Sequence, residues 1–275
     1  MAWDDYERQA LNSWRALLAS PQAADEAALH RFLEQNPAFV PGAFSFPTSG
    51  HGPVHSGVFT KPPLQGVGAR IPDFMWLATA TDSVFPILVE IESAAKRWFT
   101  AGGQPRAEFT QARNQLVAWK HWLANPINQL TFCEQYGIQG GVHRLEFHPQ
   151  FVLVYGRRTE FDEQPSLRGA RAHQQGEDEF HITFDRLAPD ANARDFLTVR
   201  LTNLGVEAVV FPPTVRLGPG IAPSWLRVRN RAEAALAEER MTPERRRFIA
   251  ARLPYWDNWA VQQQDRGWER MGDWE

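Results

Sequence analysis

The sequence predicts an α/β fold in which a mixed β-sheet is flanked by helices, and three observations support this expectation. Its 275 residues exceed the usual domain size, which is about 150 residues, so one elaborated domain or a core with an appendage is expected. Hydrophobic residues make up 43% and charged residues 22% of the chain, as in ordinary globular proteins. Helical and strand-like apolar patterns also follow each other in the order helix, strand, strand, helix, strand.

Two amphipathic helices are expected as a helical lead-in at the N-terminus. Apolar residues between Trp3 and Leu18 recur at close to helical spacing. A second helix begins near Asp25, because acidic side chains suit a helix N-terminus, and it stops at Asn36-Pro37. Residues 37–68 are rich in glycine and proline without sustained periodicity, so a long loop is expected there.

The middle of the chain carries the expected sheet. Residues 70–80 and the apolar run 84–91 are typical of two strands joined by a turn at residues 81–83. A strong helical stripe over residues 108–123 ends at Asn125-Pro126. Further strands are expected at residues 151–155, 180–184 and 206–211.

A boundary near residue 200 is expected to separate residues 1–200 from a helical C-terminal extension, residues 201–275. Thr242-Pro243 is a good helix start, because it supplies a hydroxyl cap followed by proline at the first helical position. The extension is rich in tryptophan and charge, so we expect it to pack on the body of the protein or on another subunit.

Composition excludes several classes of protein. The 29 basic and 32 acidic residues give a net charge of −3, so any contact with DNA must be local. A single cysteine cannot form an intramolecular disulfide, and the N-terminus lacks the pattern of a signal peptide. No run of about eighteen apolar residues is present, which argues against a membrane span. A cytoplasmic protein is therefore expected.

The candidate site lies where two expected strands carry acids. Asp73 lies at one expected strand, and Glu90 and Glu92 end the apolar run of the next. Adjacent antiparallel strands would bring these side chains to one end of the sheet, where they would form a site suited to Mg²⁺. Glu90 and Glu92 are two residues apart and so share a face, which leaves the backbone carbonyl of Ile91 free to face a metal.

Buried acids are costly unless they are paired, protonated or bound to a cation. The alternative to a metal site is that these acids are solvated or paired with Arg70, Lys96 or Arg97.

Five motifs in order give the chain a family resemblance. The core resembles the PD-(D/E)XK nuclease superfamily, and more specifically the C-terminal nuclease domain of the Shedu anti-phage defence proteins. The resemblance spans residues 28–187 and implies a restriction-endonuclease-like sheet in a cytosolic, Mg²⁺- or Mn²⁺-dependent nuclease. The motifs are LHRFLEQNP (29–37), GARIPDF (68–74), LVEIE (88–92, followed by a helix with Ala112, Gln115 and Trp119), VYGRR (154–158) and TFDRL (183–187).

The resemblance assigns roles to residues by position. Asp73 and Glu90 would be metal ligands, and Glu34 would be the helix acid that sometimes completes such sites. Gln115 would be a polar side chain on the following helix that faces the site.

One departure from the superfamily pattern concerns the lysine that normally follows the glutamate by two residues. This chain has Glu92 there, which can act as a base or a further ligand but shares the work of a lysine only in part. Lys96 and Lys120 are the candidates for a cation from elsewhere, and the alternative for both is an ordinary surface charge.

The function expected from the resemblance is hydrolysis of phosphodiester bonds in phage or plasmid DNA by a homo-oligomer, with a tetramer as the suggested assembly. Two other functions stay open: a nucleic-acid-binding or regulatory module whose nuclease site has lapsed, and a carboxylate hydrolase with another substrate. Four arginines are candidate contacts for nucleic acid, with pairing to nearby acids as the alternative. They are Arg70, Arg113, Arg157 and Arg158.

Overall fold

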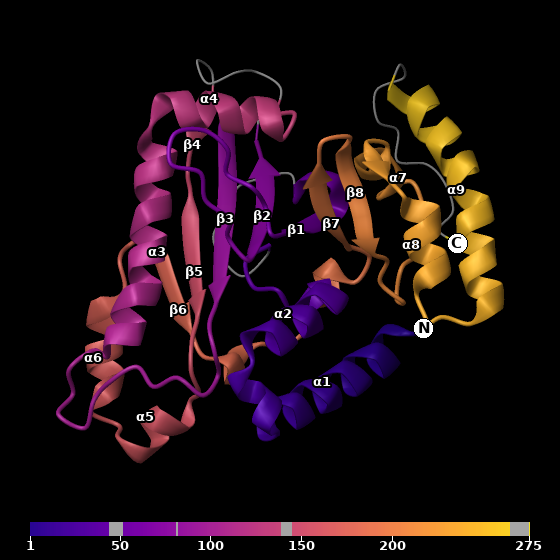
Figure 1. The fold of residues 1–275 in the computed structure, drawn as a ribbon. Coiled ribbons are helices and arrows are strands. Elements are labelled where there is room, and N and C mark those ends of the chain that lie inside the picture. The colour runs from indigo at the N-terminus through magenta and orange to yellow at the C-terminus, as the bar shows by residue number, and fades with distance from the viewer. Residues whose placement is uncertain (44–51, 81, 139–144, 265–274) are drawn as a thin grey trace.

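A mixed β-sheet forms the centre of the protein, as expected (Figure 1). The computed structural model describes residues 1–43, 52–80, 82–138, 145–264 and 275, so parts of the expected loop, turn and tail lie outside the described residues. Within the described ranges, nine strands lie in the order β6-β5-β3-β2-β1-β7-β8-β9, with β4 also paired to β3. The strands are β1 Gly57–Thr60, β2 Phe74–Thr79, β3 Ser83–Ile91, β4 Glu146–Phe147, β5 Gln150–Val154, β6 Glu179–Ile182, β7 Leu197–Thr202, β8 Gly205–Val210 and β9 Val228–Arg229.

Helices flank this sheet, and those expected at the N-terminus are confirmed. Asp25 accepts a hydrogen bond from the backbone N–H of Ala27 at 2.9 Å and so caps the second helix. The helices in the described ranges are α1 Trp3–Ala19, α2 Glu26–Gln35, α3 Ala107–Ala124, α4 Pro126–Gln135, α5 Thr159–Glu163, α6 Leu167–Gln174, α7 Ala222–Trp225, α8 Arg231–Ala237 and α9 Pro243–Gln264. None of these helices is long and apolar enough to cross a membrane.

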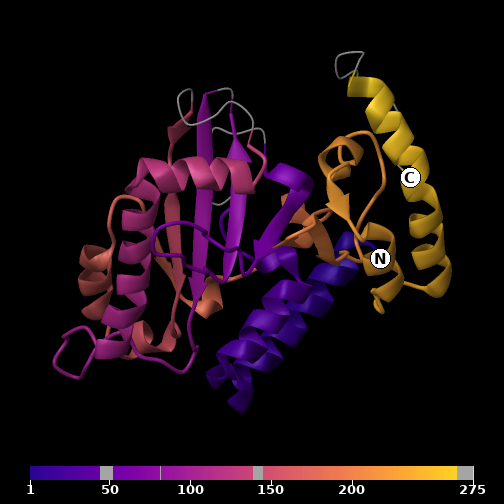
Figure 2. The ribbon, with the colours of Figure 1, turned by 45° about the horizontal axis from the view of Figure 1, so that its top comes forward.

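Strand β3 separates two hydrophobic layers. Its side chains alternate between the faces of the sheet, so Val84 and Leu88 join the core on the α3 side. Ile87 and Val89 join the core that contains buried residues of α1 and α2. Figures 1 and 2 show α3 running along the strands, and α1 beside α2 below the ends of the strands.

Strands β1 and β7 connect the predicted sheet to the C-terminal part of the chain. They pair in parallel, with Gly57 opposite Leu197, and β7 then forms a hairpin with β8. Helices α8 and α9 lie beyond β8, at the opposite side of the molecule from β6 (Figure 1). The expected boundary near residue 200 falls within β7, and the division into two domains remains a prediction.

Candidate functional site

Asp73 and Glu90 lie side by side at the ends of β2 and β3. The antiparallel register pairs Phe74 with Val89, which sets Asp73 opposite Glu90. Directly opposed side chains share one face, with Cβ atoms about 5 Å apart. The strands therefore bring the two carboxyl groups together on the sheet face covered by α3.

Strand β1 adds a lysine to this row. Its last residue, Thr60, pairs with Phe74, and the Lys61 N–H donates to the Asp73 carbonyl at 2.8 Å. The Lys61 ammonium contacts Oδ1 of Asp73. Lys61 also has a φ of 45°, a left-handed conformation that is costly for a residue with a Cβ. Backbone strain of this kind is common at functional sites.

The backbone of Ile91 faces the same acid. Its N–H donates to Oδ2 of Asp73 at 2.8 Å. The N–H and C=O of one strand residue point toward the same neighbouring strand. The Ile91 carbonyl is therefore directed to the side of β3 on which Asp73 lies.

The surroundings of Glu90 favour its protonated form. Burial, followed by the neighbouring carboxyl groups of Asp73 and Glu92, raises the pKa of Glu90 to about 9. A hydrogen bond between Glu90 and Asp73 acts in the same direction. A divalent cation that binds Glu90 would therefore have to displace a proton from it.

A second acidic group lies next to this pair. The Lys96 ammonium contacts Glu92 and donates to Oε1 of Glu26, from α2, at 2.8 Å. Burial raises the pKa of Glu92, and the hydrogen bond from Lys96 opposes that effect. Lys96 is therefore paired with two acids, and its role as a substitute for the motif lysine remains a prediction.

An open cleft of about 440 Å³ is lined by Asp73, Glu90, Glu92 and Glu26. It lies between α2, the end of β3 and α3, and it brings together most of the expected ligands and catalytic residues. The lining residues are Glu26, Ala27, His30, Arg31, Lys61, Ile71, Asp73, Glu90, Ile91, Glu92 and Gln115.

Three expected residues do not line this cleft: Lys96, described above, and Glu34 and Lys120. Glu34 accepts a hydrogen bond from the Thr60 hydroxyl at 2.8 Å and lies 3.6 Å from the Arg200 guanidinium. Lys120 contacts Asp178 and donates at 2.7 Å to Glu179, which is the first residue of β6. The side chains of Glu34 and Lys120 therefore have partners outside the cleft.

Three of the four candidate arginines are paired with acids. Arg113 lies 3.4 Å from Glu179. Arg157 and Asp185 form an ion pair at 2.8 Å. Arg158 lies 3.5 Å from Asp162. The fourth arginine, Arg70, donates from its guanidinium to the carbonyls of Gly68 and Ala69 at 3.0 Å each.

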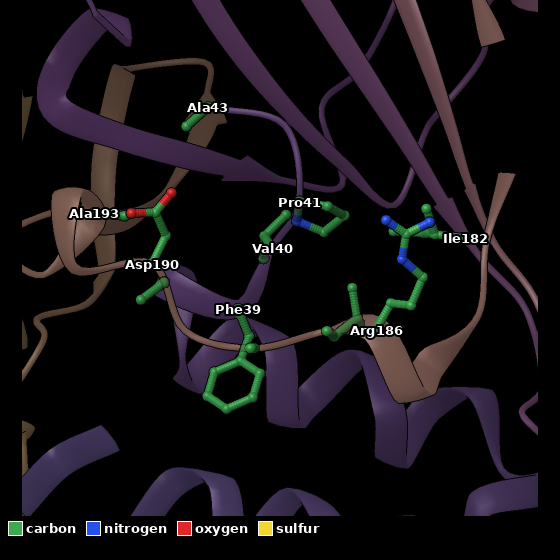
Figure 3. A pocket seen from close by; sticks show the side chains of 11 residues that line it. Phe39, Val40, Pro41, Ala43, Ile182, Arg186, Asp190 and Ala193 are labelled. Atoms are coloured by element: carbon green, nitrogen blue, oxygen red, sulfur yellow. The ribbon is translucent and has the colours of Figure 1, made fainter. Parts of the chain in front are cut away.

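A second cavity, of about 160 Å³, lies between the segment after α2 and the segment after β6 (Figure 3). Apolar side chains such as Phe39 and Val40 form much of its lining, with Arg186 and Asp190 among them. The Asp190 carboxylate accepts a hydrogen bond from the N–H of Asn192 at 2.9 Å and so caps a short turn. This cavity contains none of the expected site residues.

The oxygen ligands at the acid pair fit Mg²⁺ better than they fit an ion enclosed entirely by protein ligands. In the described ranges, no group of three or more His, Cys, Asp or Glu side chains is arranged to hold a metal ion. Mg²⁺ is commonly held by only one or two carboxylates, with waters and substrate phosphate completing its shell. Asp73, Glu90 and the Ile91 carbonyl form a set of that kind.

Sequence reasoning gave no role at the site to His30, and it indicated Lys61 only as one of the basic residues that flank the site. The His30 ring stacks on Phe74 with centroids 4.5 Å apart, and its buried Nε2 has no hydrogen-bond partner among the described atoms. Burial, followed by the charge of Lys61, lowers the pKa of His30. His30 lies in the α2 motif, which was a signal that could have placed it at the site. The contact of Lys61 with Asp73 could be predicted only from the position of β1.

Fold and cleft together define an α/β protein with a buried acid pair at the end of its central strands. The chain belongs to the Shedu family, because residues 23–188, more than half of the sequence, match the family described as "Shedu protein SduA, C-terminal". The matched part contains Asp73, Glu90, Glu92 and Gln115. No curated protein matches the chain.

Proposed function

We propose that this chain is a divalent-metal-dependent DNA endonuclease that acts in anti-phage defence. Membership of the Shedu family supports the role in defence. The observation that carries the proposed chemistry is the pair of buried, adjacent carboxyl groups of Asp73 and Glu90 that line an open cleft. Such a pair suits a site that binds a cation together with a phosphate group.

Asp73, Glu90 and the Ile91 carbonyl would hold Mg²⁺ or Mn²⁺. When bound, the ion supplies Lewis-acid polarisation of the scissile phosphate and makes water more acidic. The proton held by Glu90 is released on binding, because a ligating carboxylate must be ionised.

Other residues in the cleft, and Lys96 next to it, would provide charge and proton transfer. Glu92, whose pKa is raised by burial, is suited to accept the proton of the attacking water. Lys61 and Lys96 can offset the negative charge that develops on the phosphate, which is the work of the absent motif lysine. Gln115 offers an amide that can orient water or a phosphate oxygen.

A second candidate function is a nucleic-acid-binding module whose catalytic site has lapsed. The contact between Lys61 and Asp73 favours this alternative, because the ammonium already neutralises a carboxylate that a metal would need.

Cleavage of linear and circular DNA, with and without Mn²⁺, tests the proposal. We expect the parent to cut only with Mn²⁺, and Asp73→Asn and Glu90→Gln to lose cleavage while remaining folded. Glu146→Gln is a matched control, because Glu146 is 81% exposed and β4 pairs with the start of β3, at the other end from Glu90. DNA binding by the parent without cleavage, and without dependence on the metal, would favour the lapsed module.

A further inference from the structure

The connection between β1 and β2 forms a short arm, residues 64–70, beside the cleft. Leu64 and Arg70 close it with two backbone hydrogen bonds, at 2.8 and 3.1 Å. At its tip, Gly66 and Gly68 have φ values of 126° and 73°, which a residue with a side chain adopts only at a cost. These glycines allow the tight turn of the arm.

Helix α4 holds this arm in place. The buried Asn128 amide accepts a hydrogen bond from the Val67 N–H at 3.0 Å and donates to the Val67 carbonyl at 3.2 Å. Gln135 donates to the carbonyl of Pro63, at the base of the arm, at 2.8 Å. A Cβ on Gly66 would lie 2.6 Å from the Asn128 amide oxygen, so the contact with α4 is close. The arm is therefore held in place immediately before Ile71, which lines the cleft.

The residue that follows the arm is apolar and exposed. Ile71 lines the cleft, two residues before Asp73, and its exposed fraction is 64%. Its neighbours in the cleft are mainly charged, so burial in a core does not explain its identity. Beside it, the Arg70 guanidinium donates only to main-chain carbonyls of the arm and has no acidic partner among the described residues.

An apolar side chain and an unpaired guanidinium at the rim of a phosphate-binding cleft suit duplex DNA. Proteins that deform DNA insert isoleucine, leucine or proline between base pairs, which unstacks one base step and bends the duplex. Arginine beside such a wedge contacts the adjoining phosphate. A rigid support is needed, because a mobile wedge would lose entropy on binding.

We propose that Ile71, followed by Pro72, is a wedge that unstacks the base step next to the phosphate held at Asp73 and Glu90, with Arg70 on the flanking phosphate. This inference rests on the proposed function, since it takes duplex DNA as the substrate. Ile71 and Arg70 would then deform the DNA. The protein would favour flexible base steps, because these cost less to deform.

Binding of a short duplex containing 2-aminopurine, in Ca²⁺ and at low salt, tests the wedge without cleavage. We expect the parent to raise the probe's fluorescence, and Ile71→Ala to bind about tenfold more weakly without that rise, because the buried area of the side chain is lost. Ile71→Leu is expected to restore both signals. Leu204→Ala is the matched control, because Leu204 is 69% exposed and lies between β7 and β8.

The inference is overturned if Ile71→Ala binds and unstacks the duplex as the parent does. It is also overturned if Ile71→Ala changes the oligomeric state on size-exclusion chromatography, because Ile71 is then a contact between subunits. An Ile71-dependent signal from a protein that does not cut DNA with Mn²⁺ supports the wedge and refutes the endonuclease. Absence of DNA binding by the parent refutes both.

Discussion

Glu90→Gln should remove a pH-dependent loss of stability. The pKa of Glu90 is raised from about 4.5 to about 9 by burial and by the neighbouring carboxyl groups of Asp73 and Glu92. Between these values the folded chain retains a proton that the unfolded chain has released, so stability falls as pH rises. The slope is at most about 1.4 kcal/mol per pH unit, which gives at most about 3 kcal/mol between pH 5 and pH 7.

Glutamine has the shape of the protonated acid and does not titrate, so the difference between parent and variant isolates Glu90. Urea unfolding at pH 5, 6, 7 and 8, in EDTA, measures this difference. We expect the two proteins to have similar free energies of unfolding at pH 5 and the variant to be more stable by 1 kcal/mol or more at pH 8, on the order of the slope above. Equal pH dependence in both proteins would refute the raised pKa of Glu90.

Three other substitutions test the surroundings of the site. Lys61→Met should tighten Mn²⁺ binding in a calorimetric titration, because it removes the ammonium from Asp73, and it should slow DNA cleavage about a hundredfold. Lys61→Arg should preserve cleavage better than Lys61→Met. Weaker Mn²⁺ binding by Lys61→Met would contradict this reasoning. Asn128→Ala should lower the free energy of unfolding in urea by about 1–3 kcal/mol, because the 1%-exposed amide loses its hydrogen bonds to the arm. The control Asn258→Ala, at an exposed position, should change this free energy little. Glu160→Gln should cost a similar amount, about 1–3 kcal/mol, because its carboxylate accepts two backbone N–H groups at 2.9 Å each; a cost no larger than that of the exposed Glu163→Gln would show that these bonds contribute little.

The elements with long periodic patterns were predictable from the sequence. The stripe over residues 108–123 corresponds to α3, and the apolar run from Val84 corresponds to β3. Pro86 slightly weakened the prediction of this strand, because proline cannot donate to a ladder. It lies between the part of β3 that pairs with β4 and the part that pairs with β5, where no donor toward those strands is required.

Strand β1 was not predictable in the same way. It has only four residues, lies in a stretch rich in glycine and proline, and is defined by its pairing with β2 and β7. Helix α4 was also missed, because Pro126 reads as a helix end, although it is the first residue of a new helix that Asn125 caps.

The same distinction applies to the site. Adjacency of Asp73 and Glu90 follows from two neighbouring strands and a short turn, which local sequence patterns indicate. The position of Lys61 opposite Asp73 depends on the register of β1, and the partners of Lys120 depend on β6, more than fifty residues further along the chain. Contacts of such long range are set by tertiary pairing, which periodicity does not report.

Titration of the purified protein with Mn²⁺, without DNA, tests most directly whether Asp73 and Glu90 form a cation site. We expect binding that weakens by at least about tenfold in Asp73→Asn and is unchanged in Glu146→Gln, with proton release from Glu90 on binding. Equal Mn²⁺ affinity in the parent and Asp73→Asn, or no binding by the parent, would contradict a cation site at this pair.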